Sequence, residues 1–262
     1  MKKILIIIAL IFIIIGVTGS IFTFKGKLVD KETIEKNIDM DKIEHLDVVM
    51  SNAAVEIIPT KSKEAKIVFT GDTSKINFEE KIDQDTLYIF GKEKRITLFN
   101  VDMFSFGQSL EIELPEKVYE SIKVNTDNGK ININNLRVNI LESKTANGRI
   151  NFKNIIANDV QTRTNNGRVT LENIDGDIKA KSSNGKIEVS VDSLNQSLDL
   201  HTSNGAVRVV TKEEPTNAII DADTGNGSIR VFGKKDWDIV TGNGDHLIKL
   251  RTSNGSIRVE KE

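Results

Sequence analysis

The sequence contains no cysteine, and its 262 residues include three histidines, three prolines and one tryptophan. Without cysteine the chain can form no disulfide, no thiolate nucleophile and no Cys-ligated metal site. His45, His201 and His246 lie far apart, with no second histidine or carboxylate at ligand spacing in the sequence. This spacing predicts structural or solvated histidines. We therefore expect neither a metal nor another cofactor.

Polar residues are missing from most of the first 24 positions. Lys2 and Lys3 precede an unbroken apolar run over 4–15, and a second apolar patch covers 21–24. At about 1.5 Å per helical residue, positions 4–24 just cover a hydrocarbon core of about 30 Å. We interpret residues 1–25 as a single-pass membrane anchor with the remainder outside the cytoplasm, because basic residues precede the span. The alternative is a signal peptide whose cleavage would secrete the protein.

A short phrase, TDNGKINI at its first appearance, occurs in seven copies. In every copy the residues two and four places after the glycine are apolar, and a threonine or serine stands three places before it. Successive asparagines from the first to the sixth copy are 19, 19, 18, 20 and 22 residues apart, which predicts a repeat architecture. The structural turn pairs are Asn128 and Gly129, Asn147 and Gly148, Asn166 and Gly167, Asn184 and Gly185, Asn204 and Gly205, Asn226 and Gly227, and Asn254 and Gly255.

Two all-β architectures fit these repeats. In an antiparallel hairpin roll or sandwich, Asn-Gly closes a two-residue turn and Thr126 faces Ile131 across the hairpin. In a β-helix-like solenoid, Asn-Gly forms a corner and equivalent residues stack from coil to coil. Asn and Gly also tolerate the positive φ that a tight turn can need. We favour the solenoid of about 19 residues per coil, because stacking explains why residue types recur in all seven copies.

The chain divides into four regions in this interpretation. Residues 1–25 are the anchor or signal peptide, 26–43 a charged juxtamembrane stalk or short helix, 44–116 a divergent β-repeat region, and 117–262 regular repeats with a C-terminal cap around Trp237. The segment HLDVVMSNAAVEIIP is a degenerate first copy in which Ala53 replaces the glycine. Asn52 lies 76 residues before Asn128, or four repeat lengths, which predicts divergent coils in the interval. The aromatic stretch 96–106 is interpreted as a cap or folded loop, or alternatively as an apolar binding loop.

Motifs for catalysis are weak. The GNG sequences at Gly225 and Gly242 lead into strand-like alternation, so no helix N-terminus is available to hold a phosphate. Carboxylate pairs such as Asp175 and Asp177 flank a turn, and turn chemistry explains them. We expect no catalytic residues and no enzyme activity. The alternative is a carbohydrate-active β-helix enzyme, which would need carboxylates converging on one groove.

Charge is distributed unevenly along the chain. Residues 26–116 carry 12 Lys and Arg against 19 Asp and Glu, whereas residues 117–190 carry 12 against 8. Basic residues recur beside the turns, and stacked coils would align them at about 4.8 Å intervals into a stripe. Such a stripe would suit an anionic envelope polymer, lipid headgroups or an acidic envelope protein. Nucleic acid is not an expected partner, because the chain is exported and the stripe has no interleaved aromatics. The candidate binding residues are Lys130, Arg149, Arg168, Lys186, Arg208, Arg230 and Arg258.

The stretch SLEIELPEKVYESIKVNTDNGKI, followed by repeated T-x-NG-x-apolar-x-apolar, resembles the bacterial "putative adhesin" β-strand-repeat family. The resemblance covers the chain from about residue 44 to the end. It implies a right-handed, β-solenoid-like repeat domain on the cell envelope, with some relatives linked to envelope-stress responses, and it supplies no catalytic residues. We therefore expect a membrane-anchored, extracytoplasmic binding or scaffold module that acts in adhesion or in sensing envelope stress.

Overall fold

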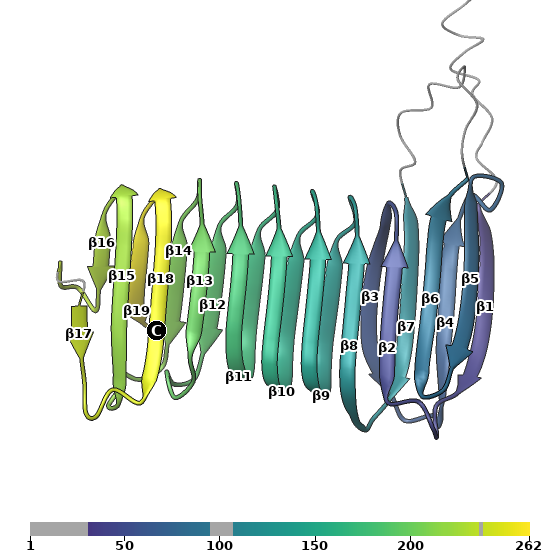
Figure 1. Ribbon diagram of the computed structural model, residues 1–262, viewed down its shortest axis with the longest axis horizontal. Helices are drawn as coiled ribbons and strands as arrows, with labels where there is room; N and C mark the ends of the chain where they lie inside the picture. Colours follow the sequence, from purple (N-terminus) through teal and green to yellow (C-terminus); the bar gives the residue numbers. More distant parts are fainter. Residues whose placement is uncertain (1–30, 95–106, 236–237) are drawn as a thin grey trace, which may run out of the picture.

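The computed structural model describes residues 31–94, 107–235 and 238–262, and within these ranges the chain is all β (Figure 1). The predicted anchor, the aromatic stretch 96–106 and Trp237 lie outside the described residues. A search of the described ranges for a helix with the length and apolar character of a membrane span finds none.

In the part of the chain that the structure describes, nineteen strands form one continuous hydrogen-bonded system. They are β1 (Glu32–Asp39), β2 (His45–Met50), β3 (Ala53–Thr60), β4 (Glu64–Gly71), β5 (Ile76–Asp83), β6 (Thr86–Glu93), β7 (Gln108–Pro115), β8 (Val118–Thr126), β9 (Ile131–Thr145), β10 (Ile150–Thr164), β11 (Val169–Ser182), β12 (Ile187–Val191), β13 (Leu198–Thr202), β14 (Val207–Thr211), β15 (Ala218–Asn226), β16 (Ile229–Val231), β17 (Asp238–Val240), β18 (His246–Asn254) and β19 (Ile257–Lys261).

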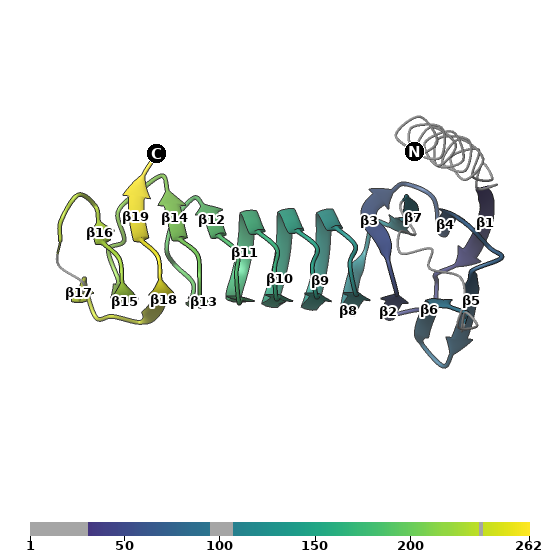
Figure 2. The same ribbon diagram turned by 90° about the horizontal axis from the view of Figure 1, so that it is seen from above.

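The repeats are stacked coils, as the favoured interpretation predicts. β9 pairs in parallel with β10, and Ile131 and Thr145 lie beside Ile150 and Thr164, one repeat later. β8 and β9, which the first Asn-Gly turn connects, are also parallel, so the hairpin alternative is wrong. Seen from above, the coils follow one another along the long axis of the molecule (Figure 2). The handedness of the coil stays a prediction.

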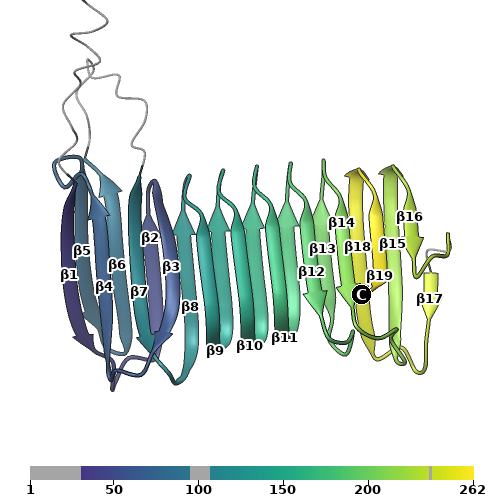
Figure 3. The same cartoon turned by 180° about the vertical axis from the view of Figure 1, so that it is seen from behind.

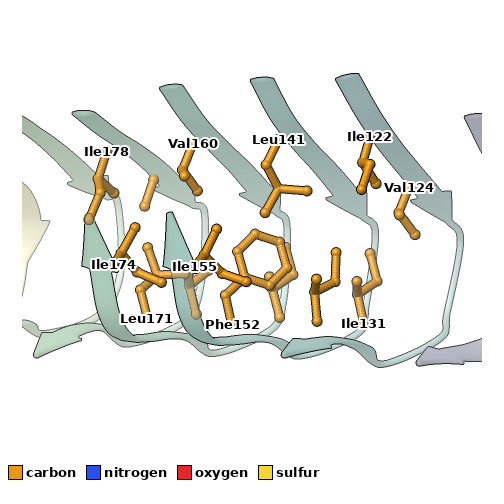
Figure 4. Close-up of a cluster of buried hydrophobic side chains, with 14 of the residues drawn as sticks. Ile122, Val124, Ile131, Leu141, Phe152, Ile155, Val160, Leu171, Ile174 and Ile178 are labelled. Atoms are coloured by element: carbon orange, nitrogen blue, oxygen red, sulfur yellow. The ribbon is translucent and has the colours of Figure 1, made fainter. Parts of the chain in front are cut away.

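The core runs through the inside of the stack. Alternate residues of each coil point inward, and Ile131, Phe152 and Leu171 are at most 1% exposed. Figure 4 shows that side chains such as Leu141 and Val160 point from one wall of the solenoid toward the opposite wall. Because each coil contributes a layer of aliphatic side chains to its neighbours, no coil buries its apolar face alone.

The long strands β9, β10 and β11 bend at a corner opposite the Asn-Gly turn. The corner residue is an asparagine in the left-handed region: Asn135, Asn154 and Asn173 have φ of 55°, 54° and 53°. Asparagine tolerates this conformation better than most residues with a Cβ. The three side chains also stack, with Nδ2–Oδ1 distances of 2.8 and 3.0 Å between neighbours. Each corner therefore both reverses the chain and joins adjacent coils.

The N-terminal part departs from two expectations. Within 26–43, residues 32–39 form strand β1, which pairs antiparallel with β4, so the predicted short helix is wrong there. The degenerate copy is confirmed, but β2 pairs directly with β8 and β3 with β9, so no further coils separate Asn52 from Asn128. The interval instead leaves the stack and returns on its outer side, where β6 and β7 form a parallel layer on β2 and β3. Antiparallel strands β4, β1 and β5 then cover that end.

The C-terminal coils are out of sequence order. β18 and β19 pair with β13 and β14 on one side and with β15 and β16 on the other. The last coil in the sequence therefore lies between the coil of β13 and β14 and the coil of β15 and β16, as the view from behind shows (Figure 3). β17 closes this end by pairing antiparallel with β15. The described residues 238–240 of the predicted cap segment form this strand, and the cap itself stays a prediction.

Candidate functional site

The Asn-Gly turns form one continuous edge of the solenoid, which we call the asparagine edge. The asparagine amide of each repeat donates through Nδ2 to Oδ1 of the asparagine in the adjacent coil. Six of these hydrogen bonds have N–O distances of 2.5–2.9 Å. The row starts at Asn52, whose own amide donates to Glu93 Oε1. In spatial order its members are Asn52, Asn128, Asn147, Asn166, Asn184, Asn204, Asn254 and Asn226.

The threonines of the repeat join the coils just beneath this edge. Thr145 Oγ1 donates to the carbonyl of Gly129 in the neighbouring coil at 3.1 Å and accepts the N–H of Gly148 at 3.0 Å. The hydroxyl three places before each of the other repeat glycines donates to the adjacent coil in the same way, at 2.9–3.2 Å. The recurrent Thr or Ser is therefore a connection between coils that is buried in every copy except that of the half-buried Thr224.

The repeat glycines have a different role from the one that the sequence suggests. None of the seven has φ in the left-handed region, so tolerance of positive φ does not explain them. A Cβ on Gly148 would lie 1.7 Å from the carbonyl oxygen of Gly129, and one on Gly167 would lie 1.7 Å from that of Gly148. The coils approach too closely here for any side chain, so glycine is required by packing between coils.

The first four predicted basic residues form a straight row beside the asparagine edge, which we call the turn row: Lys130, Arg149, Arg168 and Lys186. The residue after each of the first three members donates its backbone N–H to the carbonyl of the next member. The four members therefore lie on successive coils. Lys130, Arg149 and Arg168 are exposed and make no ion pair with any described residue. Lys186 bonds to Glu188 at 2.9 Å, so its charge is offset.

The other three predicted residues do not continue this line. Arg208, Arg258 and Arg230 lie on neighbouring coils in that order, two residues further along the strand. Arg208 lies between two carboxylates, 2.9 Å from Glu188 and 2.5 Å from Glu260. Burial raises the pKa of Glu188, but hydrogen bonds from Lys186 and Arg208 outweigh it and lower the pKa overall. The predicted stripe is thus two offset segments, and in the second the charge of Arg208 is offset by two carboxylates.

A second basic row lies on the other side of the asparagine edge, and sequence reasoning missed it. Lys144, Arg163 and Lys181 are in register on β9, β10 and β11, and His201 and Arg251 continue the row on β13 and β18. Each stands directly before the buried Thr or Ser of its repeat. That fixed position was the signal that could have identified the row.

One histidine has neighbours that its place in the sequence does not reveal. Glu44, His45 and Asp85 bring potential ligand atoms within 4.8 Å of one another, so the expected isolation of His45 is wrong. His45 Nδ1 lies 2.7 Å from Ser121 Oγ, while His45 Nε2 is 3.9 Å from Asp85 Oδ2, too far for a hydrogen bond. The imidazole therefore has one close partner, the Ser121 hydroxyl on the adjacent coil.

The fold defines a capped, parallel β-solenoid built from short repeats. The chain belongs to the Toastrack DUF4097 family, which matches residues 43–175 and 161–260. This agrees with the β-strand-repeat family suggested by the sequence motifs. No curated protein matches the chain.

Solved structures of low sequence identity are similar over most of the chain. A "putative cell adhesion protein" from Clostridium sporogenes is 14% identical, with 89% of this chain and 100% of that chain covered and a TM-score of 0.43. A "putative adhesin" from Bacteroides fragilis is 10% identical, with 88% and 98% covered and a TM-score of 0.47. A "putative lipid binding protein" from Parabacteroides distasonis is 17% identical, with 88% and 96% covered and a TM-score of 0.47.

Proposed function

We propose that this protein is a binding module of the bacterial cell envelope, held to the membrane by its N-terminal segment with the solenoid outside. It acts without catalysis, as a scaffold in adhesion or envelope-stress sensing. Its ligand is an anionic component of the envelope, either a wall polymer, lipid headgroups or an acidic protein surface. The observation that carries the proposal is the turn row, where Lys130, Arg149 and Arg168 present three unpaired cations on successive coils.

The rigid stack is what makes these cations useful. Each side chain starts from a backbone position fixed by parallel pairing and by the asparagine and threonine connections on either side. The like charges are held at a regular spacing of about 4.8 Å before a ligand binds. Little backbone entropy is therefore lost on binding, because the coils are already ordered. Attraction of this kind is strongest at low ionic strength.

Binding is tested by sedimenting purified protein with isolated envelopes, and with vesicles of phosphatidylglycerol or phosphatidylcholine. The wild type should sediment with envelopes and with anionic vesicles more than with zwitterionic ones. The variant K130Q/R149Q/R168Q should bind envelopes less, with a weaker dependence on salt. Envelope binding that is absent in the wild type, or insensitive to salt, would refute the proposed function.

The anchor is tested separately in cells. After alkaline extraction of membranes, the full-length protein should remain in the membrane pellet, and protease added to intact, wall-stripped cells should digest the solenoid. Release into the alkaline supernatant would favour a cleaved signal peptide. Protection from the protease would contradict the proposed orientation.

A further inference from the structure

The second basic row has a free part, which we call the flank row: Lys144, Arg163 and Lys181. Backbone pairing places Arg163 directly beside both of the others, about 4.8 Å from each along the stack. None of the three forms an ion pair with a described residue. The row's later member Arg251 is bonded to Asp221, so its charge is offset.

The flank row lines a depression in the wall of the solenoid. A hollow of about 290 Å³ is bordered by all three of its cations, by Lys179, and by the amides of Asn125 and Gln161. Glu142 is the one acid in that lining, and its carboxylate is 3.7 Å from the ammonium of Lys123. The hollow therefore combines uncompensated positive charge with neutral hydrogen-bonding groups.

A second hollow continues the first along the solenoid axis. It has a volume of about 720 Å³, shares Asn125 and Lys144 with the first, and extends over β2 to Lys92 on β6. Its lining also includes the acids Glu93 and Asp127, so the cations of the flank row carry most of the positive charge at the other end. Together the two hollows form a trough that crosses the strands from β6 to β11. The turn row borders neither hollow. The two basic rows thus differ in shape, because one lies along a convex edge and the other along a trough.

We infer that the trough binds a linear anionic polymer, which lies along the solenoid axis with its phosphate or carboxylate groups on the flank row. The inference rests on the proposed function for the setting of the protein in the envelope, and it assigns the polymer to a site separate from the turn row. An isolated small anion could contact one or two of these cations at their spacing, whereas an extended chain contacts all three. The amides of Asn125 and Gln161 lie where groups between the charges can accept or donate hydrogen bonds.

The test compares two triple variants of the full-length protein, K144Q/R163Q/K181Q and K130Q/R149Q/R168Q. Each removes three cations from three successive coils, so the two have the same net charge. The probes are inorganic polyphosphate, poly-glutamate, pyrophosphate and phosphatidylglycerol vesicles. Circular dichroism and thermal unfolding verify that both variants retain the fold.

The flank-row variant should lose about tenfold or more of its polyphosphate or poly-glutamate affinity at low salt, and the turn-row variant about threefold or less. The polymer whose affinity falls more in the flank-row variant identifies phosphate or carboxylate as the preferred charged group. Pyrophosphate should bind the wild type far more weakly than either polymer. The trough would be refuted if both variants lost polymer affinity equally, or if the flank-row variant lost none. If the wild type still bound envelopes, the proposed function would stand.

Two other results would replace the polymer as the occupant. Pyrophosphate binding as tight as polymer binding would indicate a site for a single ion. Vesicle binding that depends on the flank row more than polymer binding does would indicate a membrane surface. Wild-type protein that binds neither envelopes nor any of the probes would refute the inference and the proposed function together.

Discussion

Buried hydroxyl groups in this solenoid fall into two kinds that differ in their partners. On β10, Thr164 Oγ1 donates to the carbonyl of Gly148 at 3.1 Å and accepts the N–H of Gly167 at 3.1 Å. Thr162, two residues earlier on the same inward face, is also buried but its hydroxyl has no hydrogen-bond partner. The two residues therefore provide a matched comparison of a connected and an unconnected hydroxyl.

We expect Thr164→Val to lower the free energy of unfolding by about 1–3 kcal/mol, because it leaves a buried carbonyl and a buried N–H unpaired. Thr162→Val should be neutral or stabilising, since it removes a polar group that is buried without a partner. Denaturant unfolding of the two variants measures both effects. Equal destabilisation would show that the hydroxyl connection between coils contributes nothing specific.

Asp47 carries a charge in a site that disfavours it. Burial raises the pKa of its carboxyl, and repulsion from Glu142 raises it further, whereas attraction to Lys123 lowers it by less than burial raises it. The Oδ1 atom of Asp47 has no hydrogen-bond partner among the described residues. A carboxyl whose folded pKa is raised destabilises the fold when ionised, and this penalty disappears as the pH falls below the unfolded value.

Asp47→Asn should therefore stabilise the protein at pH 7, because it removes the cost of keeping an ionised carboxyl in a partly buried site. The advantage should shrink as the pH is lowered through the raised pKa and be lost below about pH 4. Thermal unfolding of both proteins between about pH 3 and about pH 7 gives the comparison. An advantage that persists undiminished at the acid end would contradict the assignment.

At the scale of the coils, the final segment of the chain is an internal layer. Leu250 on β18 is fully buried between Leu200 on β13 and Ala222 on β15. In a solenoid whose coils followed sequence order, the last coil would form the exposed end and could detach alone. Here its loss would separate β15 and β16 from the rest of the stack.

Leu250→Ala should consequently cost about 2–5 kcal/mol, as for a core leucine, and as much as Leu200→Ala in the preceding coil. Denaturant unfolding gives both values, and native-state hydrogen exchange shows whether β15, β16 and β18 open together. A much smaller cost for Leu250→Ala, with independent exchange of β18, would indicate a terminal coil that frays by itself.

The sequence predicts the coils well and their order poorly. Fixed positions for Asn, Gly, Thr and the apolar residues directly express the stacking of like residues, so the repeat period leads to the solenoid. Insertion of the last coil depends on long-range pairing of β18 with both β13 and β15, which no local pattern reports. The same limit explains why counting in repeats of 19 residues predicts coils between Asn52 and Asn128, although the two side chains are hydrogen-bonded to each other.

The candidate site was predictable in part for a related reason. The turn row follows from counting one place after each glycine, and the structure aligns it as four neighbours. The neutralisation of Arg208 by Glu260, in contrast, depends on a carboxylate 52 residues away in the sequence. The flank row was visible as the residue before each Thr or Ser, but its importance depends on a trough that only the folded wall forms.

Across the whole molecule, charge separates along the long axis. Residues 26–116, whose described part lies mostly at one end of the stack, carry the acidic excess, and residues 117–190 in the middle coils carry the basic one. The net charge of the chain is only −2, so attraction to a polyanion must come from the local arrangement of cations. This predicts a strong salt dependence in a protein that is almost neutral overall.

The most direct test of the account is the salt dependence of polyphosphate binding by the wild type and the flank-row variant K144Q/R163Q/K181Q. If the polymer contacts all three cations, removing them should reduce the slope of log K against log salt concentration by about 2, at about 0.7 per cation on a single-stranded polyanion. The turn-row variant should keep a slope near that of the wild type. A flank-row variant with the wild-type slope would contradict the claim that the trough holds the polymer.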